Sequence, residues 1–97
     1  MIVVPPAQRT EEGLLALANQ LWRETKADRN AFIYIYDDHR AALLRDKAID
    51  ERLSKADMKW HDDHFSGSYF RNINTGYHKV TIHLQGINGD VKAVPLQ

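Results

Sequence analysis

The sequence predicts a small α/β domain of the α+β-like kind, with an N-terminal right-handed βαβ unit followed by a helix and a three-stranded antiparallel meander. Three observations lead to this prediction. A β-branched run opens the chain, an amphipathic stretch separates it from an apolar run of strand length, and strand-like alternation with two turn sequences fills the last third. We expect a mixed five-stranded sheet with the two helices on one face.

The first element is a short strand over residues 2–4, at or near a sheet edge, because Pro5 and Pro6 stop it. Thr10 is the expected N-cap of the first helix, and acidic residues follow it where the helix dipole favours them. Leucines and alanines recur at helical spacing over residues 14–21, so one stripe of this helix faces a core.

The run AFIYIY over residues 31–36 predicts a central strand that is covered on both faces or nearly so. Asp37 or Asp38 is the expected cap of a second helix that continues to about Ser54. Residues 55–64 contain few apolar anchors, so we expect a connection there with room for one more helical turn.

The meander begins with strands over residues 65–73 and 77–84, joined by the turn sequence Asn74-Thr75-Gly76. Asn88-Gly89 is a strong two-residue hairpin signal and leads into a last strand over residues 91–94. The C-terminal third therefore reads as a β-hairpin extended by a third strand.

Composition limits the function classes. The chain has 97 residues, 43% of them hydrophobic and 27% charged, which fits one domain over residues 1–97 with a packed core. Thirteen basic residues balance thirteen acidic ones, so no net field draws the chain to nucleic acid or to a membrane surface. Without cysteine there is no disulfide or thiolate chemistry. With no secretory signal and no apolar run of membrane length, we expect a cytoplasmic protein. We also expect no cofactor.

The densest ionisable cluster is His61-Asp62-Asp63-His64. His61, Asp63 and His64 are candidate metal ligands, because imidazole and carboxylate groups bind zinc and other divalent ions. A small metal-dependent enzyme is the corresponding alternative function. A solvated loop explains the cluster equally simply, and we favour that interpretation because nothing in the spacing fixes a coordination geometry.

Asp37 and Asp38 follow the central strand and open a helix, the position where open α/β sheets bind ligands. The pair is therefore a candidate site for a cation or a ligand hydroxyl. We favour helix capping as the explanation, because an N-cap and the helix dipole account for both carboxylates.

The hairpin concentrates aromatic, amide and basic groups, and its candidate binding residues are Tyr69, Arg71, Asn74, Tyr77 and Lys79. Such groups on a sheet bind single-stranded nucleic acid in other proteins. With so few cations in the stretch, ordinary cross-strand packing is the interpretation we favour.

Taken together, these features predict a non-enzymatic protein-interaction module with no catalytic residues. The pattern of a βαβ unit followed by a meander is similar to that of many small bacterial or phage domains, a likeness that carries no function with it. We expect the module to be a self-associating chain or a small accessory protein of that type. The expected partner is another protein chain, or a second copy, bound through a sheet edge. Nucleic-acid binding on the meander is the less favoured alternative.

Overall fold

The computed structural model describes residues 1–24, 30–49, 52–72 and 74–96. Nine elements follow one another within these ranges. They are β1 (Ile2–Val3), a 3-10 turn (Pro6–Gln8), α1 (Glu11–Glu24), β2 (Ala31–Tyr36), α2 (His39–Ile49), α3 (Lys55–His64), β3 (Phe65–Arg71), β4 (His78–Ile82) and β5 (Lys92–Pro95).

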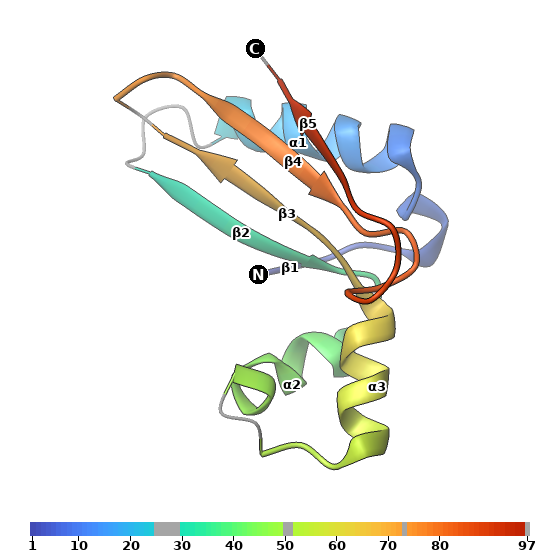
Figure 1. Cartoon of the computed structure of the whole chain (residues 1–97). Helices are drawn as coiled ribbons and strands as arrows, with labels where there is room; N and C mark the ends of the chain where they lie inside the picture. The colour runs from blue at the N-terminus through green and yellow to red at the C-terminus, as the bar shows by residue number, and fades with distance from the viewer. Residues whose placement is uncertain (25–29, 50–51, 73, 97) are drawn as a thin grey trace.

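The five strands form one mixed sheet in the order β1-β2-β3-β4-β5 (Figure 1). β1 runs parallel to β2, and each of the other neighbouring pairs is antiparallel. The predicted α+β class, the mixed sheet and the C-terminal meander are therefore confirmed.

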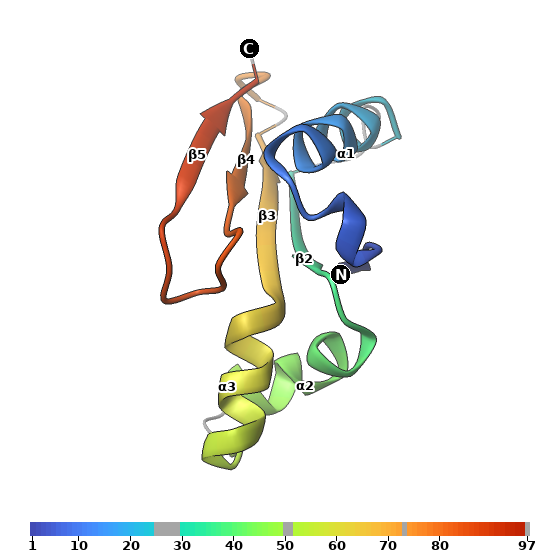
Figure 2. The same cartoon turned by 90° about the vertical axis from the view of Figure 1, so that its right-hand side faces the viewer.

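Helix α1 covers one face of the sheet and leaves the other face open (Figure 2). Its start is capped as predicted, since the amide of Gly13 donates to the hydroxyl of Thr10 at 2.9 Å. The leucines and the alanine of its apolar stripe are buried against strand residues from β2, β3 and β4, including Ile35, Tyr69 and Val80. This single helix and one sheet face make the main core.

Strand β2 is covered on both faces only at its C-terminal end. Ile35 and Tyr36 are buried, whereas Phe32 is 58% exposed because no helix lies over its face of the sheet. The expectation of a strand covered on both faces is therefore wrong for the first half of β2.

The second helix does not join α1 on its face of the sheet. Helices α2 and α3 instead form a hairpin beyond one end of the sheet (Figure 1), where Ala41 and Ala42 of α2 pack against Tyr36. Helix α3 occupies the whole stretch expected to be a connection. It is capped by Ser54, whose hydroxyl accepts the amide of Asp57 at 3.1 Å.

The two turns of the meander differ. The Asn74-Thr75-Gly76 turn is present, with Gly76 at φ 71°, while the expected strand end at residue 73 lies outside the described residues. β4 ends at Ile82 and β5 begins at Lys92, so a long loop stands where a tight Asn88-Gly89 turn was expected. This loop packs on α3, because the amide of Ile87 donates to the carbonyl of Asp62 at 2.9 Å.

Candidate functional site

A row of aromatic side chains crosses the open face of the sheet. Phe32 lies opposite Phe70 in the β2–β3 register, with ring centroids 6.2 Å apart, and Tyr34 lies 5.1 Å from Phe32. Neighbouring rings follow at 5.5 to 6.4 Å on either side. The aromatic row therefore consists of Tyr77, Phe70, Phe32, Tyr34, Phe65 and Tyr36.

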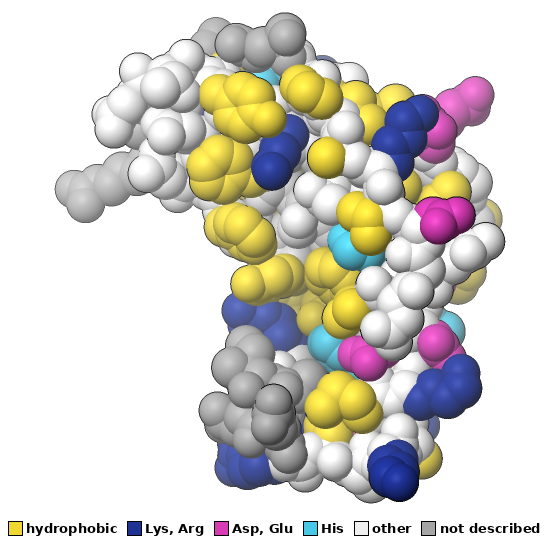
Figure 3. Space-filling view, viewed as in Figure 1, with side chains coloured by type: hydrophobic (Ala, Val, Ile, Leu, Met, Phe, Trp, Pro, Cys, Tyr) yellow, Lys and Arg dark blue, Asp and Glu magenta, His cyan; other side chains and the backbone are white. Residues whose placement is uncertain are grey.

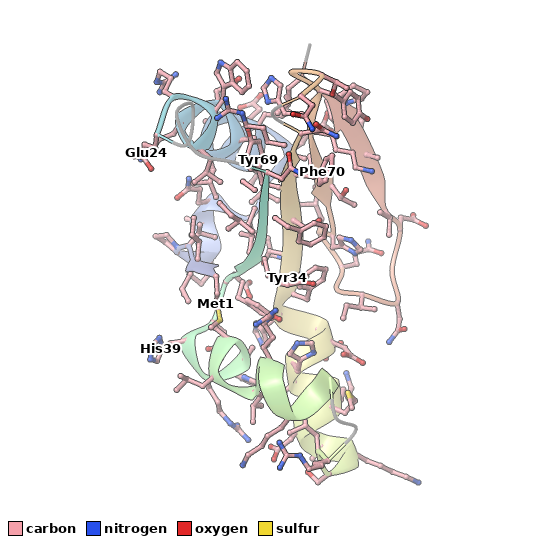
Figure 4. All side chains as sticks on the ribbon, turned by 90° about the vertical axis from the view of Figure 1, so that its left-hand side faces the viewer. Met1, Glu24, Tyr34, His39, Tyr69 and Phe70 are labelled. Carbon is pink, nitrogen blue, oxygen red and sulfur yellow. The ribbon has the colours of Figure 1, made fainter. Side chains whose placement is uncertain are left out.

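Figure 4 shows that Tyr34 and Phe70 point away from α1, whereas Tyr69 points toward it. In the space-filling view, hydrophobic side chains gather in a band over the middle strands (Figure 3). The band leads to a hollow where the sheet meets α2 and α3. The surface therefore combines a flat aromatic part with a recessed end.

The recess is a cavity of about 250 Å³ between the sheet, the helical hairpin and the β4–β5 loop. Its walls are mostly apolar, and the polar groups on them belong to Arg45, His61 and Asp62. Its volume is below the roughly 300–1,000 Å³ of pockets for drug-sized ligands, so it matches one large side chain or a very small molecule. The lining residues are Tyr34, Tyr36, Arg45, Met58, His61, Asp62, Phe65 and Ile87.

Two cations border the aromatic row. The guanidinium of Arg45 lies 4.3 Å above the ring of Tyr34, a cation–π contact. Lys79 is opposite Phe70 in the β3–β4 register and therefore shares its face. The open face is thus aromatic with a positive margin.

The outer edge of β2 is only partly covered. β1 pairs with Ile35 and Tyr36, and in the described ranges no strand lies beside the first half of β2. The amide of Val4 donates to the carbonyl of Tyr36 at 2.8 Å, which shows that Tyr36 directs its backbone groups to this edge. Since alternate residues of a strand direct these groups to the same side, Phe32 does so as well. Its N–H and C=O therefore face an unpaired edge.

The predicted hairpin residues are divided between the two faces. Tyr69 and Arg71 are buried on the α1 side, where the Arg71 guanidinium lies 4.4 Å from the Trp22 ring. Lys79 lies on the opposite face and Tyr77 is exposed at the end of the aromatic row. Asn74 is exposed in the turn, where its amide donates to the side chain of Asn72 at 2.9 Å. The five residues therefore do not form one site.

The predicted metal ligands have other partners. Nδ1 of His61 is hydrogen-bonded to the carboxylate of Asp62 at 3.0 Å, and its Nε2 to the buried hydroxyl of Tyr36 at 2.9 Å. Asp63 pairs with Lys59, and His64 bonds Asp37. Within the described ranges, no group of three or more His, Asp or Glu residues is placed to hold a metal ion.

Asp37 belongs to a network at the junction of sheet and helical hairpin. It accepts from the Arg9 guanidinium at 3.2 Å and from Nδ1 of His64 at 2.8 Å. Arg9 also donates to the carbonyls of Phe65 and His83, at 3.1 and 2.8 Å. These contacts give Asp37 a structural role in holding segments together.

Asp38 caps α2, as the capping interpretation expects, since it accepts the amide of Ala41 at 3.0 Å. Its carboxylate also accepts the indole N–H of Trp60 at 2.8 Å. The hydrogen bond from Trp60 is the main reason that the pKa of Asp38 is lowered. The carboxylate is therefore a fixed link between α2 and α3.

Two histidines, one in β4 and one just after it, have lowered pKa values. Burial, with a smaller effect of nearby Arg71, lowers the pKa of His78, whose ring stacks on Trp22 at 4.2 Å. Burial also lowers the pKa of His83, which lies against Phe65. Burial therefore disfavours the charged form of both rings in the folded protein.

The sequence did not single out Phe32 and Tyr34, which together with Phe70 of the hairpin form the centre of the open face. The signal was the alternation of β2 and β3, which places these three residues on one side and Ile33 and Tyr69 on the other. Alternation does not tell which side a helix covers.

No family model, curated protein or solved structure matches this chain. None of the helices in the described ranges is long and apolar enough to cross a bilayer. Fold and site define an α+β domain whose sheet is open on one aromatic face.

Proposed function

We propose that this protein is a non-enzymatic protein-interaction module, an accessory protein that binds an extended segment of another chain on the open side of its sheet. The observation that carries the proposal is the coincidence of two features on one strand. β2 offers the unpaired backbone groups of Phe32 and, on the same residue, an exposed ring in the aromatic row.

Strand addition uses both features. The backbone of an incoming segment pairs with the free edge, and its alternate side chains rest on the rings of the open face. Aromatic residues are common at protein interfaces because they bury a large area at a small entropic cost. The cavity beside Tyr34 then receives a single large side chain of the partner.

The interaction is tested with peptides selected from a phage-displayed library of random linear sequences. The best peptide is synthesised and titrated into isotopically labelled protein, and amide shifts are followed by NMR. We expect the largest shifts in β2, around Phe32 and Tyr34. Phe32→Lys should weaken binding at least about tenfold, a loss of about 1.4 kcal/mol.

The matched control is Leu43→Lys, because Leu43 is 65% exposed on α2, away from the aromatic row. It should leave peptide affinity unchanged. Two results would contradict the proposal. Selected peptides would bind Phe32→Lys as tightly as the wild type, or they would shift only the amide signals of residues on the α1 side of the sheet.

Single-stranded nucleic acid is a second candidate ligand, favoured by Lys79 beside Phe70 and by Arg45 over Tyr34. Bases stack on such rings while cations pair with phosphates. A labelled oligothymidine of about 15 nucleotides tests this by fluorescence anisotropy. Binding at low salt that Lys79→Ala weakens, with a smaller salt dependence, would favour nucleic acid over a protein partner.

A further inference from the structure

The cavity at the end of the aromatic row has a wall of rings. Tyr34 and Tyr36 both lie against Phe65, with ring centroids 6.3 and 5.5 Å apart, and all three residues line the cavity. Met58 and Ile87 add further apolar surface. Aromatic rings pack well edge-to-face or offset on other rings, and a thioether makes favourable contacts with a ring edge. The shape and chemistry of this wall therefore suit an aromatic occupant.

Two charged groups of opposite sign also line the cavity, the guanidinium of Arg45 and the carboxylate of Asp62. A cationic occupant would meet Arg45 and an anionic one would meet Asp62, and either would lose hydration in a mostly apolar space. Charge complementarity therefore favours a neutral occupant. The Arg45 guanidinium lies 4.3 Å from the ring of Tyr34, and among neutral side chains a cation prefers the face of an indole.

The Asp62 carboxylate can accept a further hydrogen bond. Its side chain is 20% exposed, and one of its oxygens is bonded to Nδ1 of His61 at 3.0 Å. Among the residues that the structure describes, no other group is hydrogen-bonded to this carboxylate. The other ring nitrogen of His61 is bonded to the hydroxyl of Tyr36 at 2.9 Å. Since a carboxylate accepts several hydrogen bonds, Asp62 is the acceptor for a donor that enters the cavity.

We propose that the partner segment inserts a tryptophan into this cavity, with the indole N–H donating to Asp62 and the ring packed on the aromatic wall beside Arg45. This inference rests on the proposed function and names the side chain that the partner contributes. Tryptophan is neutral, has the ring that cations prefer and has one N–H donor, whereas phenylalanine and leucine have no donor. Tyr34 is on the same face of β2 as Phe32, two residues away, so a segment beside Phe32 reaches the cavity.

Indole and 1-methylindole test the hydrogen bond on the wild-type protein, because methylation removes the N–H. Each compound is titrated to about 5 mM, a range suited to so small a ligand, into isotopically labelled protein. We expect indole to shift the amide signals of Asp62 and Ile87, and 1-methylindole to bind at least about fivefold more weakly. Equal affinity of the two compounds, or no shift with indole, would overturn the tryptophan site.

Asp62→Ala shows whether the preference for indole depends on the carboxylate. Without this acceptor, the two compounds should bind within about twofold of each other. Asp63→Ala is the matched control, because Asp63 pairs with Lys59 on the surface, and it should keep the preference for indole. A full preference in Asp62→Ala would assign the effect to the added methyl group and would overturn the proposed hydrogen bond.

Peptides distinguish this inference from the proposed function. The best selected peptide should contain a tryptophan, and its replacement by phenylalanine should weaken binding at least about fivefold. A peptide without tryptophan that binds at β2 would overturn the inference and leave the proposed function intact. Indole that enters the cavity while no selected peptide binds the open face would overturn the proposed function, and the tryptophan of a partner with it.

Discussion

At the residue scale, the Arg9 side chain joins segments that are far apart in the sequence. Its guanidinium bonds Asp37 just after β2, the carbonyl of Phe65 at the start of β3 and the carbonyl of His83 just after β4. The Arg9 and Asp37 side chains are only 12% and 8% exposed. The helical hairpin is therefore attached to the sheet through a nearly buried ion pair.

Asp37→Asn should lower the free energy of unfolding by about 2–4 kcal/mol, because it leaves the Arg9 charge nearly buried without its counter-charge. Urea denaturation followed by Trp fluorescence measures the change. Asp63→Asn is the control, since Asp63 pairs with Lys59 on the surface, where such pairs contribute under about 0.5 kcal/mol. Similar losses for the two variants would contradict a structural role for the Arg9 network.

The lowered pKa values of His78 and His83 make stability depend on pH. Below about pH 6.5 the unfolded chain takes up protons that the folded chain does not bind, so stability falls as the pH drops from 7 toward 5. Each histidine contributes a slope of at most about 1.4 kcal/mol per pH unit, and neither contributes above pH 7.

Urea midpoints between pH 5 and 8 measure this slope. His78→Phe keeps a ring against Trp22 but cannot titrate, so its stability should fall less steeply with acid than that of the wild type. An unchanged slope in this variant would show that His78 is not held neutral by the fold.

At the element scale, periodicity and capping predicted most of the structure. The stripe of α1, the Thr10 cap and the alternation of β4 are strong signals because each follows from local geometry. Helix α3 was missed because Met58 and Trp60 are its main apolar anchors. The sequence feature that indicates α3 is its N-cap. Ser54, followed three residues later by Asp57, forms a capping box, which marks a helix start even where the apolar stripe is weak.

The β4–β5 loop shows what turn signals leave undetermined. Asn88-Gly89 predicts a tight hairpin, but the loop is longer because it packs on α3 through Gly86 and Ile87. That contact depends on a segment distant in the sequence, and local preferences do not contain it.

Gly86→Ala should destabilise the protein by about 1–3 kcal/mol. Gly86 has φ 84°, which disfavours any side chain, and an added Cβ would collide with the carbonyl oxygen of Asp62. Urea denaturation gives the loss, and faster amide exchange at Ile87 would locate it. Asn88→Ala, exposed in the same loop, should change stability by under about 0.5 kcal/mol, and an equal loss there would refute the Gly86 contact as the cause.

At the scale of the whole molecule, the open face results from the placement of the helices. An apolar run such as AFIYIY is typical of a strand buried on both sides, and here only its end is so covered. With α2 and α3 at the end of the sheet, no helix of the described residues lies over the aromatic row except at Tyr36, which packs against α2. The candidate site could not be located from sequence, because alternation defines two faces without telling which one a distant helix will cover.

Amide hydrogen exchange at Phe32, compared with its neighbour Ile33, shows directly whether the outer edge of β2 is unpaired. Ile33 has the opposite phase and pairs with Tyr69 in β3, so its amide should exchange slowly at every concentration. In the free protein the Phe32 amide should exchange nearly as fast as in an unfolded chain, and it should become protected when a bound peptide is added. A Phe32 amide as slow as that of Ile33 in the free protein would show that the edge is already paired within the chain and would contradict the account.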